Sequence, residues 1–133
     1  SLLVKSSDES FATLDVCRVN LYTGEVSLYK AGGAETYVRC GKKFVRLDGS
    51  GIPLGIGVPA EVGEKRFFVA EGDVLLMMSD GADPDPTWLE QLTMRERSAN
   101  LDTILDTVGE ALRLSAEKGK EDDMTVIGVK ITK

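Results

Sequence analysis

Two acidic segments of the sequence have the residue types that divalent-cation chemistry needs. Asp80 follows an apolar run and precedes Gly81, so its carboxylate stands at the end of a predicted strand where the chain has room to turn. Asp122 and Asp123 stand just before the last apolar run. Neighbouring acids repel one another, and a bound cation would remove that conflict. Taken separately, each segment also fits a simpler interpretation: an Asp-Gly turn in the first case, a solvated turn in the second.

The composition excludes most other kinds of active site. The 133 residues include no histidine, which excludes Ser-His-Asp and Cys-His mechanisms and the usual zinc sites. Oxygen donors without histidine or cysteine favour magnesium, manganese or calcium. Such a cation can activate water at neutral pH and bind a phosphoryl group. The two acidic segments therefore indicate a hydrolytic metal site built from carboxylates.

Charge and hydropathy limit the partners and the location of the chain. A net charge of −6 argues against binding to nucleic acid or to an anionic membrane surface, and suits a cation or a basic partner. No stretch approaches the ~20 apolar residues that a membrane helix needs, and no signal peptide is visible. Cys17 and Cys40 are far apart and form no Cys-x-x-Cys pair. We therefore expect two reduced, buried thiols in a cytoplasmic protein.

The elements that must position the acids are mostly strands, with two helices late in the chain. The hydrophobic patterns and turn residues predict strands over 11–21, 26–30, 36–40, 43–47, 67–70, 74–79 and 125–131. They predict helices over 87–95 and from Asn100, a good N-cap, to the Lys118-Gly119 stop. If the strand ending at Ser79 and the final strand are antiparallel neighbours, Asp80 and Asp122 come to the same sheet edge. The class is α+β.

Several motifs in order resemble the type 2C (PPM) metal-dependent phosphatases. The resemblance starts from Ser-Asp-Gly after an apolar strand, a helix pair, and Asp-Asp-Met-Thr-Val before the last strand. Four further segments narrow it to the stage II sporulation protein E branch, and together the motifs cover nearly the whole chain. These segments are residues 10–15, 29–34, 52–56 and 72–81.

This resemblance implies an α-β-β-α sandwich with a two-metal centre of Mn²⁺ or Mg²⁺ and hydrolysis of phosphoserine. By similarity Asp80 and Asp122 are metal ligands, with Gly81 and Asp123 beside them. The implied substrate is a phosphorylated anti-sigma-factor antagonist in bacterial sporulation or stress signalling.

The acidic loop with Asp83 and Asp85 corresponds to a segment that faces the substrate in the family. Two other hypotheses use the same acids. One is a calcium-binding or regulatory module, against which the spacing Asp80-x-x-Asp83-x-Asp85 counts, because it does not match an EF-hand loop. The other is an interaction module in which all these acids are solvated.

One family motif is missing from the sequence. The bridging Asp of the family lies in an Asp-Gly-x-Gly motif upstream of residues 11–15, and Asp48-Gly49-Ser50-Gly51 only imitates it in a loop segment. We therefore expect residues 1–133 to be the C-terminal part of one phosphatase domain, without its first strands and helices. Alone it should be inactive and metal-free, and it should self-associate through the surface left uncovered. The resemblance also implies membrane tethering of the full-length protein through an N-terminal region.

Overall fold

The chain forms two compact units. The computed structural model describes residues 14–31, 34–47, 63–79, 82, 84–95, 100–116 and 124–132. Unit 1 comprises residues 1–33 and 48–69, and unit 2 comprises residues 34–47 and 70–133. The Asp48–Gly51 motif lies outside the described residues. That residues 1–133 form one partial domain stays a prediction.

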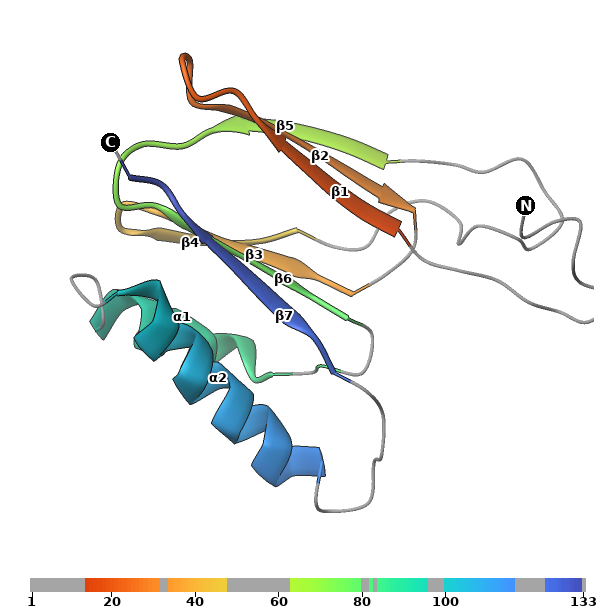
Figure 1. Cartoon of the computed structure of the whole chain (residues 1–133), viewed down its shortest axis with the longest axis vertical. Helices are drawn as coiled ribbons and strands as arrows, with labels where there is room; N and C mark the ends of the chain where they lie inside the picture. The colour runs from red at the N-terminus through yellow and green to blue at the C-terminus, as the bar shows by residue number, and fades with distance from the viewer. Residues whose placement is uncertain are drawn as a thin grey trace, which may run out of the picture. The chain divides into compact units, whose positions relative to one another are not determined.

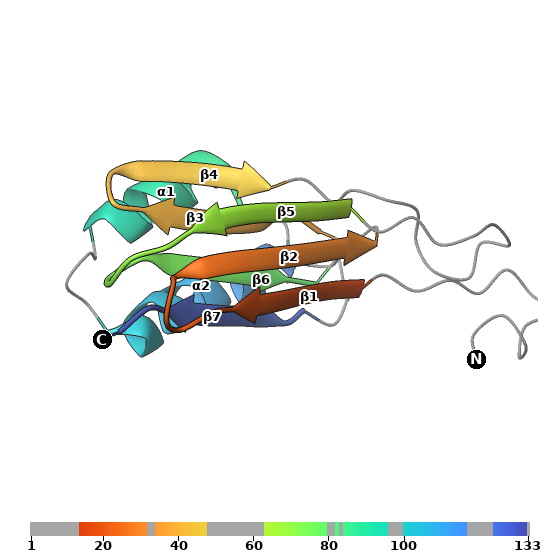
Figure 2. The same ribbon diagram turned by 90° about the horizontal axis from the view of Figure 1, so that it is seen from above.

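Unit 1 contains a three-stranded antiparallel sheet. Its strands are β1 (Leu14–Val19), β2 (Glu25–Ala31) and β5 (Gly63–Phe68), and β2 lies between the other two (Figure 2). The predicted turn after β1 is confirmed: the Asn20 side chain accepts hydrogen bonds from the Tyr22 and Thr23 amides. Gly24 completes this turn with a φ of 76°, and a Cβ there would lie 2.5 Å from the Val69 carbonyl oxygen. A side chain at position 24 is therefore excluded.

A buried ion pair joins the first two strands of unit 1. The Lys30 ammonium lies 2.8 Å from Oδ2 of Asp15, and the Lys30 side chain is fully buried. The pair follows from the register, because Asp15 stands opposite Lys30 between β1 and β2. The other carboxylate oxygen of Asp15 is buried without a hydrogen-bond partner among the described residues. Burying the Lys30 charge without the opposite charge of Asp15 would be strongly unfavourable. The pair therefore favours the register in which these two residues face each other.

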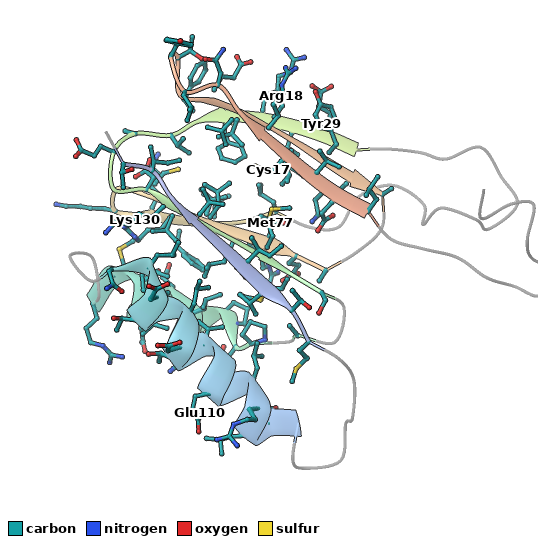
Figure 3. All side chains as sticks on the ribbon, viewed as in Figure 1. Cys17, Arg18, Tyr29, Met77, Glu110 and Lys130 are labelled. Carbon is teal, nitrogen blue, oxygen red and sulfur yellow. The ribbon has the colours of Figure 1, made fainter. Side chains whose placement is uncertain are left out.

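One face of the unit 1 sheet is partly apolar and exposed. Arg18 and Tyr29 project from one side of the sheet, and Cys17 projects from the other (Figure 3). By strand alternation Val16 shares the face of Arg18, and its side chain is exposed, as is that of Phe68. This is the kind of surface on which self-association was predicted. That association stays a prediction.

Unit 2 is a four-stranded antiparallel sheet with two helices. The strand order is β4 (Lys43–Leu47), β3 (Thr36–Cys40), β6 (Val74–Met78) and β7 (Val126–Lys130). Helices α1 (Pro86–Arg95) and α2 (Leu101–Ala116) cover the same face of this sheet (Figure 1). β6 is the most apolar strand and lies between two neighbours, as its continuous run of hydrophobic residues predicted. The predicted α+β class is confirmed.

Helix α2 packs on the sheet through the predicted stripe. Ile104, Val108 and Leu112 are buried in one core with Leu76 and other residues of the sheet and of α1. The predicted N-cap is confirmed, because the Asn100 side chain accepts a 2.9 Å hydrogen bond from the amide of residue 103. The opposite side of the helix is charged, and Glu110 projects from α2 away from the sheet (Figure 3).

Gly128 of β7 allows α2 to approach the sheet closely. A Cβ at this position would lie 2.9 Å from Cδ1 of Leu101 and 2.9 Å from Cδ2 of Leu105. Both contacts are with the ends of flexible leucine side chains, so we expect Gly128→Ala to be tolerated with little loss. Gly128→Val should cost about 1–3 kcal/mol, because the larger side chain overpacks the interface. Urea unfolding of both variants measures this, and equal stability of Gly128→Val and the parent would contradict the close approach.

A network of buried polar groups ties the turns at one end of the unit 2 sheet. Arg39 donates to the carbonyl oxygens of Gly41 and Gly72, at 3.1 and 2.6 Å. The Asp73 carboxylate accepts hydrogen bonds from the amides of Gly41 and Ala70. Burial, together with the charge and hydrogen bonding of Asp73, raises the pKa of Cys40, which therefore stays a thiol at neutral pH. The side chains of Arg39 and Asp73 therefore join the turn between β3 and β4 to the turn that precedes β6.

The fifth strand was placed wrongly from the sequence. The prediction was residues 67–70, whereas β5 is Gly63–Phe68. Its first four residues are Gly-Glu-Lys-Arg, which show no apolar alternation. The backbone pairing with β2, from Glu25↔Phe68 to Lys30↔Gly63, makes this charged segment a strand. Both cysteines are free, and both are half-buried rather than buried as predicted.

Candidate functional site

The two strands that lead to the acidic segments are antiparallel neighbours, as predicted. β6 pairs with β7 from Val74↔Lys130 to Met78↔Val126. The end of β6 and the start of β7 therefore lie together at one end of the unit 2 sheet. Asp80 follows that end of β6 by two residues, and Asp122 precedes the start of β7 by four.

Ser79 and Thr125 hold this end of the two strands together. The Ser79 amide donates to the Thr125 carbonyl oxygen at 2.9 Å. In return, the Thr125 amide donates to the side-chain hydroxyl of Ser79 at 2.8 Å. The contact joins residues 46 positions apart in the sequence. It therefore links the two chain segments that carry the candidate ligands.

Ser79 also bonds to a residue that follows β6 in the sequence. The Ala82 amide donates to the Ser79 carbonyl oxygen at 3.0 Å. Ala82 itself is buried in the core between sheet and helices. Ser79 and Ala82, which flank Asp80 and Gly81 in the sequence, are therefore joined by a hydrogen bond and held by β6 and by the core.

Most of the predicted site residues lie outside the described part of the chain. These residues are Asp80, Gly81, Asp83, Asp122 and Asp123. Asp80 is covalently next to Ser79, and Asp123 is two residues before Thr125. Their roles stay predictions, which rest on the position of the described residues that flank them.

Asp85 is the predicted site residue that the structure does describe. Its carboxylate accepts a 3.1 Å hydrogen bond from the Thr87 amide, and its carbonyl oxygen accepts one from the Leu89 amide. Asp85 therefore caps helix α1, with Pro86 at the first helical position. Its carboxylate is exposed, and a substrate-facing role for it stays a prediction.

Glu35 is an acid near the same sheet end that the sequence did not point to. It precedes Thr36, which pairs with Met77 of β6. One oxygen of its carboxylate accepts a hydrogen bond from the Tyr37 hydroxyl at 2.9 Å, and the other lies 3.4 Å from Nε of Arg46. Only the strand register places Glu35 at the same end of the sheet as Ser79. Because both its oxygens have partners, Glu35 is less available to a cation than an unpaired acid.

The acids predicted for this sheet end are of the type that binds magnesium or manganese. The described residues contain no group of three His, Cys, Asp or Glu side chains that could hold a metal. The predicted ligands Asp80 and Asp122 lie outside the described residues, and in the sequence they follow and precede two strands that Ser79 and Thr125 join. Carboxylate oxygens are the donors that hard cations prefer.

No helix in the described ranges is long and apolar enough to span a membrane.

Solved structures confirm the fold of a metal-dependent phosphatase domain. The phosphatase domain of the cell fate determinant SpoIIE from Bacillus subtilis is 26% identical, with a TM-score of 0.71 over 99% of this chain and 61% of that one. The catalytic domain of the serine/threonine protein phosphatase PstP, solved with 2 manganese ions, has a TM-score of 0.68 at 13% identity. That match covers 91% of this chain and 59% of the other, and it shows the fold alone.

Sequence comparison gives the family. The stage II sporulation protein E (SpoIIE) family matches residues 1–132. Stage II sporulation protein E of Priestia megaterium is 30% identical over 98% of this chain. The match spans only 23% of that relative, so the chain corresponds to less than a quarter of its length. The chain belongs to the stage II sporulation protein E family.

Proposed function

We propose that this chain forms part of a metal-dependent protein phosphatase that hydrolyses phosphoserine. The observation that carries the proposal is the bond between Ser79 and Thr125, which joins the end of β6 to the start of β7, the two strands that the acidic segments follow and precede in the sequence. The absence of histidine from the sequence favours hydrolysis through metal ligands rather than through a histidine base. Family membership and the PPM-type fold support the same conclusion.

The residues that would hold the metal are Asp80 and Asp122. In the proposal both carboxylates bind Mn²⁺ or Mg²⁺, and Gly81 and Asp123 lie beside them. A bound divalent cation supplies Lewis-acid charge that activates water and neutralises the charge of a phosphoryl group. Asp123, as the acid next to a ligand, would orient Asp122 and add negative charge that attracts the cation.

In the proposal, the residues of this chain position the metal ligands and do not transfer protons. The described contacts of Ser79 and Thr125 join the ends of the two strands next to which Asp80 and Asp122 stand in the sequence, and in the proposal this pairing preforms the site. Preformed donors need little rearrangement during the reaction, which is the main source of rate in phosphoryl transfer. The loop before α1, with Asp83 and Asp85, is the part proposed to face the substrate.

The proposed substrate is a phosphorylated protein of the anti-sigma-factor antagonist type. The support is membership of a family whose relatives are stage II sporulation proteins. A phosphorylated serine on a folded protein presents a dianion, and a cation held by carboxylates suits it. The net charge of −6 would otherwise repel such a group, so binding should depend on the metal.

Hydrolysis of a phosphoserine peptide by the whole protein tests this function. We expect activity with added manganese, loss of activity on chelation, and recovery when manganese is returned. Hydrolysis that chelation leaves unchanged would contradict the metal-dependent mechanism. Manganese binding without any hydrolysis would instead favour the cation-binding regulatory module.

A further inference from the structure

The hairpin of β3 and β4 in unit 2 is a basic segment of an acidic chain. Residues 36–47 contain four cationic residues and no acid, whereas the whole chain has a net charge of −6. Three of the four cationic side chains are exposed, namely Lys42, Lys43 and Arg46. Arg46 lies 3.4 Å from the carboxylate of Glu35. Among the described residues, neither Lys42 nor Lys43 has an ion-pair partner.

β4 is also an edge strand. Among the described strands it pairs with β3 alone, and it stands at one end of the order β4-β3-β6-β7 (Figure 2). Cys40 faces Lys43 across a two-residue turn, an arrangement in which the two residues exchange backbone hydrogen bonds. Because such bonded pairs alternate along antiparallel strands, Phe44 directs its backbone amide and carbonyl away from β3. An edge of this kind can accept a further strand.

Side-chain contacts hold the hairpin in place on both sides of its turn. The ring of Phe44 stacks on the buried ring of Tyr37, with the two centroids 5.6 Å apart. At the turn, Arg39 donates to the carbonyl oxygen of Gly41 at 3.1 Å, and the carboxylate of Asp73 accepts from the Gly41 amide at 3.0 Å. A strand that is already fixed loses little conformational freedom when another strand pairs with it, and this favours binding.

The charge of the edge decides which kind of strand it accepts. A second copy of β4 would add the same excess of cations, and lysines on an edge strand are a common protection against such self-pairing. An acidic strand would instead bring carboxylates to Lys42 and Lys43. The side chain of Val45 is 41% exposed on the same strand and offers an apolar contact to an added strand.

We propose that the β4 edge binds an extended acidic segment of a protein partner, which adds to the unit 2 sheet as a further strand. The backbone of this segment bonds to the outward amide and carbonyl of Phe44, and its carboxylates pair with Lys42 and Lys43. The main-chain bonds supply affinity, and the charges select the partner. The inference does not depend on the proposed metal site, because it uses none of the residues of that site.

Three synthetic peptides separate the contribution of the backbone from that of charge. The probe is a fluorescently labelled octapeptide of alternating glutamate and valine. One control peptide has lysine in place of glutamate, and the other keeps glutamate but has every backbone nitrogen methylated. In fluorescence anisotropy with the whole protein, we expect the probe to bind at least about tenfold more tightly than either control, because the first lacks the charges and the second lacks the amide donors.

Substitution of the two lysines tests the charges on the protein. The double variant Lys42→Ala with Lys43→Ala should bind the probe about fivefold more weakly than the parent, since two exposed ion pairs are lost. The matched control is Arg18→Ala with Arg113→Ala, which removes two exposed cations from β1 and α2. This control should bind the probe as tightly as the parent. Equal affinities of the lysine variant and the control would overturn the assignment of the edge to an acidic partner.

Amide hydrogen exchange at single residues locates the bound peptide. When the probe is added to the whole protein, exchange at Phe44 should slow at least about fivefold, because its outward amide gains an acceptor. Exchange at Val45 should change little, since Val45 faces Val38 and is already bonded to β3. Absence of binding, equal binding of the glutamate and lysine peptides, or unchanged exchange at Phe44 in the presence of bound probe would overturn the proposal.

Discussion

Replacing Asp122 or Asp80 with alanine in the whole protein is expected to lower manganese-dependent hydrolysis at least about 100-fold. The reason is that residues which merely orient a metal ligand are already worth about 10- to 100-fold. A ligand itself should be worth more. Asp123→Ala should have a smaller effect, since Asp123 is proposed only to support Asp122. Initial rates with a phosphoserine peptide at saturating manganese give the order of the three effects.

The matched control is an acid of the same type away from the sheet end. Asp106 is exposed on helix α2, so Asp106→Ala removes the same charge from the same chain. Its hydrolysis rate should equal that of the parent. A loss of activity in Asp106→Ala as large as that in Asp122→Ala would indicate a general effect of charge rather than a metal ligand. Full activity of Asp80→Ala would remove Asp80 from the site.

Replacing Lys30 with alanine is expected to destabilise the protein by about 3–5 kcal/mol. Breaking a buried ion pair from one side costs this much, because the partner charge stays buried and uncompensated. Here the partner is Asp15, whose side chain is only 14% exposed. One of its oxygens already has no hydrogen-bond partner among the described residues. Urea unfolding gives the change in free energy, provided that its slope with denaturant is unchanged.

A double variant distinguishes the missing partner from simple loss of packing. Lys30→Met with Asp15→Leu removes both charges and fills the space with apolar atoms, a change that is often neutral or stabilising. We expect it to recover most of the stability lost in Lys30→Ala. The surface pair of Glu110 and Arg113, 2.6 Å apart on α2, serves as the control, and breaking it should change stability little. A double variant as unstable as Lys30→Ala would contradict the account of the pair.

Turn chemistry and burial made most of the fold predictable. β3 and β4 have the predicted bounds, because Gly41 provides the positive φ that a short hairpin turn needs. The start of α2 was predicted from Asn100, whose side chain accepts a hydrogen bond from an amide in the first turn of the helix. The predicted start of β5 was four residues too far along the chain. The charged residues at its start form a strand because they pair with β2. Pairing between distant segments is not encoded in local composition.

The strand pairing next to the candidate site was predictable from the sequence, whereas the site residues themselves stay predictions. The order of strands and acids predicted that β6 and β7 are neighbours, and the pairing confirms it. The contact of the Ser79 hydroxyl with the Thr125 amide was missed, because it depends on where the regular pairing of β6 and β7 ends. The pairing of Lys30 with Asp15 was missed for a similar reason: the two residues meet only in one register.

Manganese titration followed by NMR tests the central claim most directly, because a paramagnetic ion broadens the amide signals nearest to it. We predict that the amide signals of Ser79, Ala82 and Thr125 broaden first. The amides of Gly41, Gly72 and Ile131, at the other end of the same sheet, should stay sharp, since the length of β6 separates them from the site. Broadening that begins at the exposed acids of α2 (Asp102, Asp106 and Glu110), or no broadening at all, would contradict a metal centre at the end of β6 and the start of β7.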